Sequence, residues 1–360
     1  MHSLEPKGAS FQVNLLQRIC LRRYRNFIVI GLSALGICLW LFSRSDSLGS
    51  LGVQLIRPPS PQHGTKDSQR PTTEDQRNSG TDTNPSEGIQ HLIPQKIWQI
   101  QLPKKNQEED KPVDPESLKD TASWLALNRD YAYTLVGKAG ADKFIRDHYS
   151  HQTHLVESYN SLTNVGMKSD LLRYLILSIE GGVYTDTDTL AIKPIDLWVP
   201  KNMRDKVRLI VGIEFDRRDG GGWADIPHWL QFCQWTIAAA PGHPVFPRMV
   251  SRALRSIDDL ASTHNSSIGQ LNPSSFEVMN STGPAAWTDV VFELLQEHDP
   301  SLNDTKDLSF MTEPKLYGDI LVLTIDGFGM GQSHSHSTHD GSIPDAALMK
   351  HLFRGSWRGD

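Results

Sequence analysis

The chain has 360 residues, of which 38% are hydrophobic, and its formal net charge is −6 at pH 7. This acidic balance excludes a general nucleic-acid-binding protein, which would normally carry a basic excess. Three cysteines are too few for a disulfide-rich scaffold, and 27 Gly with 21 Pro exclude a collagen-like or wholly low-complexity chain.

The first distinctive feature along the chain is an uncharged apolar stretch at residues 27–43, FIVIGLSALGICLWLFS. Its 17 residues would span roughly 25 Å as a helix, the short end of the range for a membrane span. Arginines at positions 18, 22, 23 and 25 precede it, and only Arg44 follows closely. The positive-inside rule therefore predicts a cytosolic tail at residues 1–26 and transfer of the rest of the chain across the membrane.

Two other interpretations of residues 27–43 are a cleaved signal peptide and a buried core helix. The region before the apolar stretch is unusually long for a signal peptide, and no A-x-A site follows. A core helix seldom has arginines on one flank and a polar tract on the other. A short anchor suits the thinner membranes of the early secretory pathway better than the plasma membrane.

Residues 44–90 are predicted to be a disordered stem. No hydrophobic residue occurs from Arg57 to Gly88, so this stretch cannot bury enough apolar surface to offset its ordering entropy. Residues 91–360 then form one lumenal domain, which contains a single cysteine, Cys233, and can form no internal disulfide. Three N-glycosylation sequons agree with a lumenal location, although each is weak alone, and they begin at Asn265, Asn280 and Asn303.

Strands and helices alternate in the predicted secondary structure of this domain. Strands are expected at Leu92–Ile100, Tyr131–Val136, Val183–Thr185, Leu209–Ile213 and Ile320–Ile325. Helices are expected at Glu116–Asn128, Lys138–Tyr149, Asp170–Ile179 after an N-cap at Ser169, His228–Ala239, Pro244–Leu260, Ala285–Gln296 and Asp345–Phe353. This alternation predicts an α/β domain with a mainly parallel central sheet flanked by helices.

A pair of aspartates follows the predicted strand Val183–Thr185, in the sequence Asp186-Thr-Asp188. A D-x-D pair alone is a weak signal, and a solvated acidic strand end is the alternative. Here an apolar helix, a glycine turn at Gly181 and a buried strand place both carboxylates at the strand's C-terminal end, where open α/β sheets bind ligands. Carboxylates there could share a hard cation such as Mg²⁺ or Mn²⁺ and neutralise a diphosphate leaving group.

The block SDLLRYLILSIEGGVYTDTDT resembles the signature of glycosyltransferase family 32, whose members contain a D-x-D motif and have a GT-A fold. The resemblance extends over most of residues 92–357. The runs QFCQWTIAAAPGHP from Gln231, STGP from Ser281 and HLFRGSW from His351 resemble the initiation-specific α-1,6-mannosyltransferases of the fungal Golgi. The family topology of a cytosolic tail, anchor, stem and lumenal catalytic domain agrees with the predicted organisation.

The resemblance also implies roles for individual residues. Asp186 and Asp188 would bind the metal and the donor sugar, and His351 would be a further metal ligand. Donor-binding roles fall on Trp98, which would stack on the nucleobase, on Asp170 and Arg173, and on Ser356 and Trp357 at the diphosphate. Each has a plainer interpretation: Trp98 as a core residue, Asp170 and Arg173 as an intrahelical i, i+3 ion pair, and His351 as a structural histidine.

Weaker signals concern the acceptor side. Glu214 and Asp216 follow the predicted strand Leu209–Ile213, where an acceptor-side carboxylate would belong, although both could be solvated. The glycines of residues 327–331 and the nearby His334, His336 and His339 predict a mobile loop rather than a metal site, because glycines and serines surround the histidines. Two features depart from the subgroup: PHWL replaces the usual basic residues before QFCQW, and the sequence ends three residues after Trp357.

The resemblance implies a Golgi enzyme that transfers mannose from GDP-mannose, with Mn²⁺, in α-1,6 linkage onto the mannose core of an N-glycan with retention of configuration. Membrane anchoring and a complex with other Golgi mannosyltransferases are expected, and nucleic-acid binding is not. One alternative is a non-catalytic or polymerising subunit of a mannan-synthesising complex. Another is a family member that mannosylates a sphingolipid, although such enzymes normally carry further apolar spans and none follows Ser43.

Overall fold

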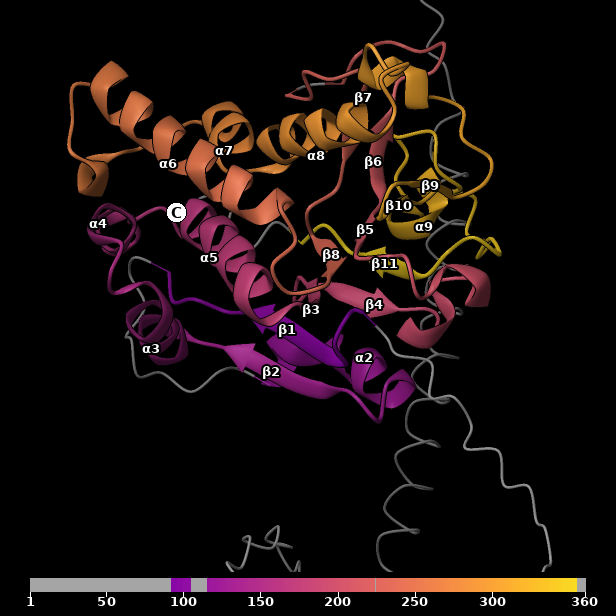
Figure 1. Ribbon diagram of the computed structural model, residues 1–360, viewed down its shortest axis with the longest axis horizontal. Helices are drawn as coiled ribbons and strands as arrows, with labels where there is room; N and C mark the ends of the chain where they lie inside the picture. Colours follow the sequence, from indigo (N-terminus) through magenta and orange to yellow (C-terminus); the bar gives the residue numbers. More distant parts are fainter. Residues whose placement is uncertain (1–91, 105–114, 224, 355–360) are drawn as a thin grey trace, which may run out of the picture. The chain divides into compact units, whose positions relative to one another are not determined.

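The computed structural model describes residues 92–104, 115–223 and 225–354 (Figure 1). Within these three segments, no helix is both apolar and long enough to cross a membrane. The predicted tail, anchor and stem, residues 1–90, lie outside the described part of the chain.

A seven-stranded sheet lies at the centre of the fold. Its strands are β1 Lys96–Ile100, β2 Ala132–Val136, β3 Gly182–Thr185, β5 Leu209–Val211, β8 Thr236–Ala239, β9 Lys315–Tyr317 and β10 Ile320–Val322. Their order across the sheet is β2-β1-β3-β8-β5-β10-β9. Strand β1 is parallel to β2 and β3, and β10 is parallel to β5, but β8 is antiparallel to both of its neighbours and β9 is antiparallel to β10. The α/β class is confirmed. The sheet is mixed, with three parallel and three antiparallel pairings, so the expectation of a mainly parallel sheet holds only in part.

Both faces of the sheet are buried, as the alternation of side chains along its strands shows. In β3, Val183 belongs to one core cluster and Tyr184 to the other, and in β8 Ala238 and Ile237 divide in the same way. Successive residues of a strand point to opposite faces, so each cluster fills one face. A sheet covered on both sides reads as continuous apolar runs rather than as alternating ones.

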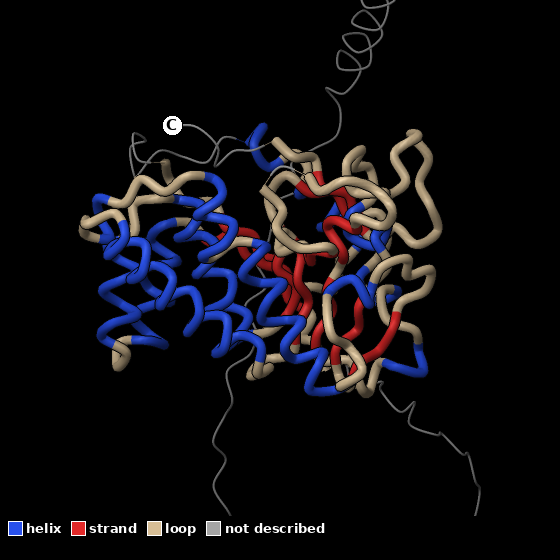
Figure 2. Tube along the Cα trace, turned by 90° about the horizontal axis from the view of Figure 1, so that it is seen from above, coloured by secondary structure: helices blue, strands red, loops and turns tan. Residues whose placement is uncertain are grey.

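The larger core cluster lies between the sheet and a layer of helices, which Figure 2 shows packed side by side next to the strands. These helices are α3 Lys138–Tyr149, α4 Thr153–Ser161, α5 Val165–Glu180, α6 Val245–Thr263, α7 Ser275–Ser281 and α8 Pro284–His298. The predicted helices Lys138–Tyr149, Pro244–Leu260 and Ala285–Gln296 are confirmed within two or three residues. The stacked rings of Tyr174 on α5 and Trp287 on α8, with centroids 5.5 Å apart, join two members of this layer.

The smaller core cluster covers the opposite face with short elements. These are α2 Thr121–Leu127, α9 Ile325–Gly329 and the 3-10 turns Ile195–Leu197 and Lys201–Met203. Three further 3-10 turns span Pro115–Leu118, Ile268–Gln270 and Thr305–Leu308. Trp198 fills the centre of this cluster, since its ring meets Trp124 edge-on at 6.0 Å and Phe328 at 5.0 Å.

Two small two-stranded sheets flank the central one. One pairs β4 Thr189–Ala191 with β11 Met349–His351, and the other pairs β6 Ile213–Asp216 with β7 Leu230–Phe232, both antiparallel. Strand β4 begins directly after the two aspartates, so its partner β11 brings the C-terminal part of the chain back to them (Figure 1).

Two predicted helices are wrong. The run His228–Ala239 forms β7 and β8, and Asp345–Phe353 contains β11. Every residue from Leu230 to Ala240 is buried, so the run shows neither a helical nor an alternating pattern, and such runs do not distinguish a strand from a helix. The insertion of β8 between β3 and β5 makes the centre of the sheet antiparallel.

Helix α5 carries the chain into the strand that precedes the aspartates. It begins at Val165, where the Asn164 side chain accepts a hydrogen bond from the backbone N–H of Met167, so the predicted N-cap at Ser169 lies inside the helix. Its C-cap is Gly181, with φ 59°, and a Cβ atom there would lie 2.7 Å from the carbonyl oxygen of Ala239. Only glycine fits this turn, because it needs a positive φ and a close approach to β8.

Candidate active site

The two aspartates lie where β3 ends, between β1 and β8. The backbone of Asp186 is fixed on both sides, because its N–H donates to the carbonyl oxygen of Trp235 at 2.8 Å and its carbonyl oxygen accepts from Gln99 Nε2 at 3.0 Å. The hydroxyl of Thr189 donates to the same carbonyl at 2.6 Å. The Asp186 side chain remains 29% exposed. The turn therefore holds the backbone while it leaves the carboxylate accessible.

His351 joins the two aspartates through the pairing of β11 with β4, in which it lies opposite Thr189. Its Nε2 atom is 3.1 Å from Oδ1 of Asp188. One potential ligand atom from each of Asp186, Asp188 and His351 lies within 4.8 Å of the others. The structure thus brings together the three residues that the sequence predicts as metal ligands.

Asp188 is also held by the backbone that follows β11. The backbone N–H of Arg354 donates to Oδ2 of Asp188 at 2.9 Å, and the N–H of Leu352 donates to its carbonyl oxygen at 2.9 Å. Burial alone would raise the pKa of Asp188, but the hydrogen bonds from His351 and Arg354 hold that pKa below its ordinary value. The carboxylate is therefore ionised at neutral pH, as a metal ligand must be.

Two aromatic rings fix the orientation of the His351 imidazole. The Trp235 ring stacks on it, with centroids 4.7 Å apart and planes 18° from parallel, and the Phe353 ring meets it edge-on at 4.0 Å. Trp235 is itself held by the hydrogen bond from its Nε1 atom to the carbonyl oxygen of Phe328 at 3.1 Å. No sequence pattern assigns a role to Trp235 of the QFCQW run, because its ring contact with His351 joins residues that lie far apart in the chain.

The donor set fits a divalent cation. Carboxylate oxygens suit hard cations such as Mg²⁺ and Mn²⁺, and an imidazole nitrogen suits transition metals. His351 Nδ1 is buried without a hydrogen-bond partner among the described residues. Asp186, Asp188 and His351 would hold the ion, whose identity the donor set does not specify.

A buried arginine connects the acidic pair to helix α5. The guanidinium of Arg173 lies 2.9 Å from Asp170 and 3.5 Å from Asp186, and its Nη1 donates to the carbonyl oxygen of Gln234 at 2.9 Å. The same guanidinium lies over the Tyr184 ring, 4.5 Å from its centroid. The predicted i, i+3 ion pair between Asp170 and Arg173 is confirmed, and Arg173 also makes a long-range contact to the first aspartate.

The acidic partner of this arginine is saturated with hydrogen bonds. Asp170 accepts from the hydroxyl of Thr282 at 2.9 Å and from Nε2 of Gln234 at 3.1 Å, in addition to its contact with Arg173. Burial is the main cause that raises the pKa of Asp170, to about 6, although these donors and Arg173 oppose the rise. Burial would lower the pKa of Arg173, but Tyr184, Asp186 and Asp170 raise it, so the guanidinium stays charged.

Tyr184 is a site residue that the sequence analysis missed. Its hydroxyl donates to Oδ1 of Asp186 at 2.5 Å, and burial raises its pKa well above the ordinary value. The neutral phenol therefore remains a donor and fixes one oxygen of Asp186. The YTDTD spacing contained a signal for this contact, since Tyr184 and Asp186 are two residues apart and point to the same side of the strand.

Trp98 lies on β1. Among the described residues, no hydrogen bond or ring contact joins its side chain to Asp186 or Asp188. Its Nε1 atom donates to the carbonyl oxygen of Gly181 at 2.8 Å, and its half-buried ring packs against the larger core cluster. This packing agrees with the plainer interpretation as a core residue, and the nucleobase role stays a prediction. The other two predicted donor contacts, Ser356 and Trp357, lie outside the described residues.

The structure does not join Glu214 and Asp216 to the cluster of Asp186, Asp188 and His351. Asp216 is 2% exposed, and it accepts hydrogen bonds from the backbone N–H of Phe310 at 2.9 Å and from the hydroxyl of Ser309. Glu214 is also buried, and it accepts from Nε2 of Gln231 at 3.0 Å. Neither carboxylate is solvated, and their predicted acceptor role remains a prediction.

The loop that contains His334, His336 and His339 is anchored, so the expectation of a mobile loop is wrong. The His334 ring stacks on Trp223 with centroids 4.9 Å apart, and His339 Nδ1 lies 2.8 Å from the carbonyl oxygen of Ser337. The backbone N–H of Thr338 donates to Asp326 at 2.7 Å. The glycines Gly327 and Gly329 belong to α9.

The three sequon asparagines lie at the surface. Asn265 follows helix α6 and is exposed, Asn280 lies half-buried on α7, and Asn303 is exposed before the turn Thr305–Leu308. The Nδ2 atoms of Asn280 and Asn303 donate to the carbonyl oxygens of Phe276 at 2.7 Å and Ser301 at 2.9 Å.

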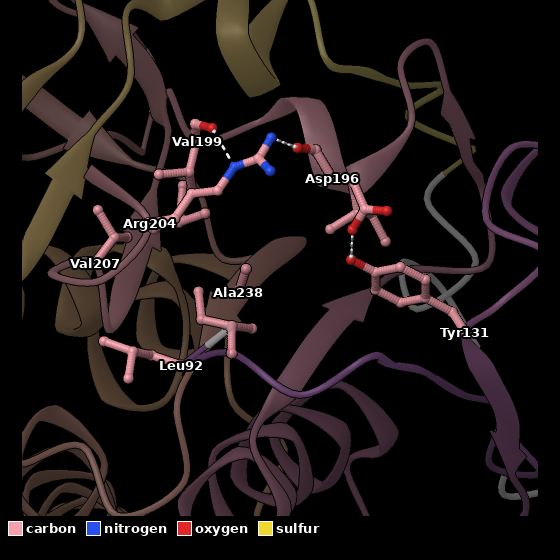
Figure 3. A pocket seen from close by; sticks show the side chains of 10 residues that line it. Leu92, Tyr131, Asp196, Val199, Arg204, Val207 and Ala238 are labelled. Carbon is pink, nitrogen blue, oxygen red and sulfur yellow. Dashed lines mark hydrogen bonds between the residues drawn. The ribbon is translucent and has the colours of Figure 1, made fainter. Parts of the chain in front are cut away.

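A small pocket of about 30 Å³ lies elsewhere, beside the residues that lead into β1 (Figure 3). The hydroxyl of Tyr131 donates to Asp196 at 2.8 Å across it, and Nε of Arg204 donates to the carbonyl oxygen of Val199 at 3.2 Å. None of Asp186, Asp188 or His351 lines this pocket. Its volume suits ordered water rather than a nucleotide sugar, so the candidate site is the side-chain cluster.

Comparison with known proteins gives concordant results. The family "Glycosyltransferase sugar-binding region containing DXD motif" matches residues 115–205. The chain is 34% identical to an initiation-specific alpha-1,6-mannosyltransferase of Schizosaccharomyces pombe, over 74% of this chain and 64% of that protein, which is less than two thirds of its length. It is 33% identical to the protein of the same name from Candida albicans, over 74% of this chain and 73% of that protein.

Among solved structures, the PaToxG glycosyltransferase is similar over 58% of this chain and 72% of that chain, with 18% identity and a TM-score of 0.38. The curated relatives match at far higher identity, and the residues that carry the motif, Asp186 and Asp188, fall inside the matched family segment. The chain therefore belongs to the DXD-containing glycosyltransferases of family 32, in the subgroup of the fungal initiation-specific α-1,6-mannosyltransferases.

Proposed function

We propose that this chain is a metal-dependent, retaining mannosyltransferase that moves mannose from GDP-mannose onto a mannose of an N-glycan core in α-1,6 linkage. The observation that carries the proposal is the cluster of Asp186, Asp188 and His351, which lies beside the buried Arg173 at the C-terminal end of β3. Both relatives named above are α-1,6-mannosyltransferases by name. That name supports mannose as the donor sugar and α-1,6 as the linkage. The guanine base of the donor, the metal and the N-glycan acceptor are part of our proposal only.

Breaking the bond between the anomeric carbon and the diphosphate leaves negative charge on the diphosphate. A divalent cation at the cluster would act as a Lewis acid that neutralises this charge, a contribution of several kcal/mol. Arg173 adds a permanent positive charge held in place by Asp170, Asp186 and Gln234. A charge that is already oriented costs no reorganisation when the bond breaks.

Retention of configuration requires either a covalent intermediate on a carboxylate or attack from the face that the leaving group occupies. Asp170 is unsuited as the nucleophile, because Arg173, Gln234 and Thr282 occupy its oxygens and the residue is 4% exposed. Its role is to orient Arg173. In the front-face route the 6-hydroxyl oxygen of the acceptor mannose bonds to the anomeric carbon as the bond to the diphosphate breaks, and the departing diphosphate takes the hydroxyl proton. In the covalent route GDP departs first as a carboxylate bonds to the anomeric carbon, and the acceptor oxygen then displaces that carboxylate, which takes the proton.

The test is a donor panel with the full chain in detergent micelles. GDP-mannose and UDP-sugars are each offered with a high-mannose glycan, with and without Mn²⁺, and the product linkage is read by digestion with an α-1,6-specific mannosidase. We expect transfer with GDP-mannose and Mn²⁺ only. Transfer with UDP-sugars alone would contradict the mannose donor, and no transfer together with stable association with another mannosyltransferase would favour the role of a non-catalytic subunit.

Matched variants test the metal site directly. Asp186→Asn and Asp188→Asn keep the shape of each side chain but remove the charge, so we expect transfer by the folded variants to fall at least a hundredfold. Asp205→Asn, at an exposed position outside the cluster, is the control. Unchanged transfer in both site variants would contradict the metal-site proposal.

The proposed location is the Golgi, with residues 1–26 in the cytosol and the catalytic domain in the lumen. The arginine bias around residues 27–43 supports this orientation, and the surface positions of Asn265 and Asn303 allow glycosylation. Protease treatment of sealed Golgi vesicles tests it. We expect the domain to be protected and its sequons to carry endoglycosidase-sensitive glycans, whereas digestion of the domain in sealed vesicles would overturn the orientation.

A further inference from the structure

A row of aromatic rings leads from the candidate metal cluster to the surface. It consists of Trp235, His351, Phe353, His334 and Trp223, and is called the aromatic row below. Successive centroids are 4.7 Å apart from Trp235 to His351, 4.0 Å from His351 to Phe353, 6.4 Å from Phe353 to His334 and 4.9 Å from His334 to Trp223. The second member of the row, His351, is a predicted metal ligand.

The inner end of the aromatic row is buried, and its outer part is partly exposed. Trp235 is 5% exposed, whereas Phe353 is 44% and Trp223 is 50% exposed. An exposed phenylalanine and an exposed tryptophan, one on each side of the His334 ring, leave apolar surface in water, and grouped apolar surface of this kind marks a ligand or partner site. Scattered single residues would need no such explanation, but these rings are continuous with the acidic cluster.

The outer part of the row is held in place before any ligand arrives. His334 lies in a loop anchored by the buried hydroxyls of Ser335 and Ser337, which bond to each other at 3.0 Å and to the carbonyl oxygen of Gln332. Trp223 lies in a facing loop in which Gly220 packs so closely that a Cβ atom there would be 2.9 Å from Nε2 of His336. Two anchored loops thus present one surface, which lowers the entropic cost of binding.

The chemistry of the surface suits a sugar ring. One face of a hexopyranose consists of C–H groups with slight positive charge, and the face of an aromatic ring carries the negative part of its quadrupole. Burial lowers the pKa of His334, so its ring is neutral at neutral pH and offers the same kind of face. Arg173 and Asp170, the predicted contacts of the donor, lie on α5, and they reach the acidic cluster from a different element than the row does.

We propose that Trp223, His334 and Phe353 form the acceptor subsite, a stacking platform for the mannose rings of the glycan beside the metal-held donor. This inference rests on the proposed function, because it takes the donor to lie at Asp186 and Asp188. It assigns a role to three residues outside the acidic cluster, and it places acceptor recognition at the aromatic row rather than at Asp216, whose carboxylate is engaged by Ser309 and Phe310.

Trp223→Ala in the full chain is the test, with Trp223→Phe as the conservative variant that keeps a ring. Phe276→Ala is the matched control, because Phe276 is a similarly exposed aromatic, 51%, on helix α7 and outside the row. We expect the KM for a high-mannose glycan to rise about tenfold in Trp223→Ala and much less in Trp223→Phe. The KM for GDP-mannose and the hydrolysis of GDP-mannose without acceptor should change less than twofold in all three variants.

Binding without chemistry separates this inference from the proposed function. Saturation-transfer NMR of an α-mannose oligosaccharide, recorded without donor, should show contact with the parent chain and a loss of signal in Trp223→Ala. This result would support the platform even if the donor panel failed. Equal glycan binding by the parent and Trp223→Ala, or no binding by the parent, would overturn it, and a raised KM for GDP-mannose alone would assign the row to the nucleobase instead.

Discussion

Nε2 of His351 lies 3.1 Å from Oδ1 of Asp188, although 163 positions separate the two residues along the chain. The contact depends on the pairing of β11 with β4, which starts directly after the two aspartates. The D-x-D pair thus supplies two of the three potential ligands from one short segment, and the pairing of β11 with β4 brings the third, His351, next to them. A cation that bridges these groups would stabilise the attachment of β11 as well as bind substrate.

We predict that His351→Ala weakens binding of Mn²⁺ on the order of tenfold or more, because one of three donors is lost. A ligand that binds only the folded state raises its stability by about 2.7 kcal/mol at a hundred times its dissociation constant. The unfolding midpoint of the parent should therefore rise as Mn²⁺ is titrated, and the curve of His351→Ala should shift to higher metal concentrations. His154→Ala, at a 60% exposed histidine paired with Asp258, is the control. Identical metal titrations for His351→Ala and the parent would contradict the prediction.

The helix–turn–strand unit before the aspartates could be predicted from the sequence because all of its signals are local. The apolar residues of α5, the glycine turn at Gly181 and the short strand that ends at Thr185 succeed one another within about twenty positions. Local patterns of this kind are the most dependable basis for assigning elements. The i, i+3 pair of Asp170 and Arg173 is equally local, and both its existence and its position near the site were predictable.

The remainder depended on contacts between distant segments. Burial on both faces removes any periodicity from Leu230–Ala240, so the sequence pattern does not distinguish β8 from part of a helix and does not reveal the antiparallel centre of the sheet. The hydroxyl of Tyr174, which donates to Gln234 at 2.6 Å, illustrates the same limit, since no sequence pattern relates residues 60 positions apart. For Asp216, a position after a strand indicated the surface, whereas the segment at Ser309 and Phe310 covers its carboxylate.

The raised pKa of Asp170, about 6 against an ordinary 3.8, predicts a pH dependence of stability. The folded state binds this proton more tightly than the unfolded state, so the contribution is fully present below about pH 4 and is lost as the pH rises through 6. At about 1.4 kcal/mol per pKa unit, the loss is on the order of 3 kcal/mol. In urea titrations from pH 4 to pH 6, the free energy of unfolding of the parent should therefore fall relative to that of Asp170→Asn. Curves that stay parallel across this window would show that Asp170 does not titrate there.

Gly181→Ala should destabilise the fold by at least about 2 kcal/mol. The substitution combines a positive φ of 59° with a Cβ atom 2.7 Å from the carbonyl oxygen of Ala239 and from the ring of Pro241. Gly242→Ala separates the two causes, because Gly242 has φ 69° but nothing within 4 Å of the added atom. We expect Gly242→Ala to cost about 1 kcal/mol, the strain of the left-handed backbone alone. Equal losses of unfolding free energy for both variants in urea denaturation would mean that β8 and the ring of Pro241 move away from the added Cβ atom without destabilising the fold.

Asp216→Asn distinguishes a structural carboxylate from one that touches the acceptor. The buried carboxylate accepts hydrogen bonds from the backbone N–H groups of Arg218 and Phe310 and from the Ser309 hydroxyl, so the amide would place a donor against at least one of these donors. Losing a buried charge-assisted hydrogen bond in this way costs about 2–3 kcal/mol of folding stability. We therefore expect a lower unfolding midpoint for Asp216→Asn and an unchanged KM for glycan. A raised KM for glycan without a change in the unfolding midpoint would instead place Asp216 at the acceptor. Glu214→Gln is the comparison on the same strand, β6. Its amide oxygen can still accept the hydrogen bond from Nε2 of Gln231.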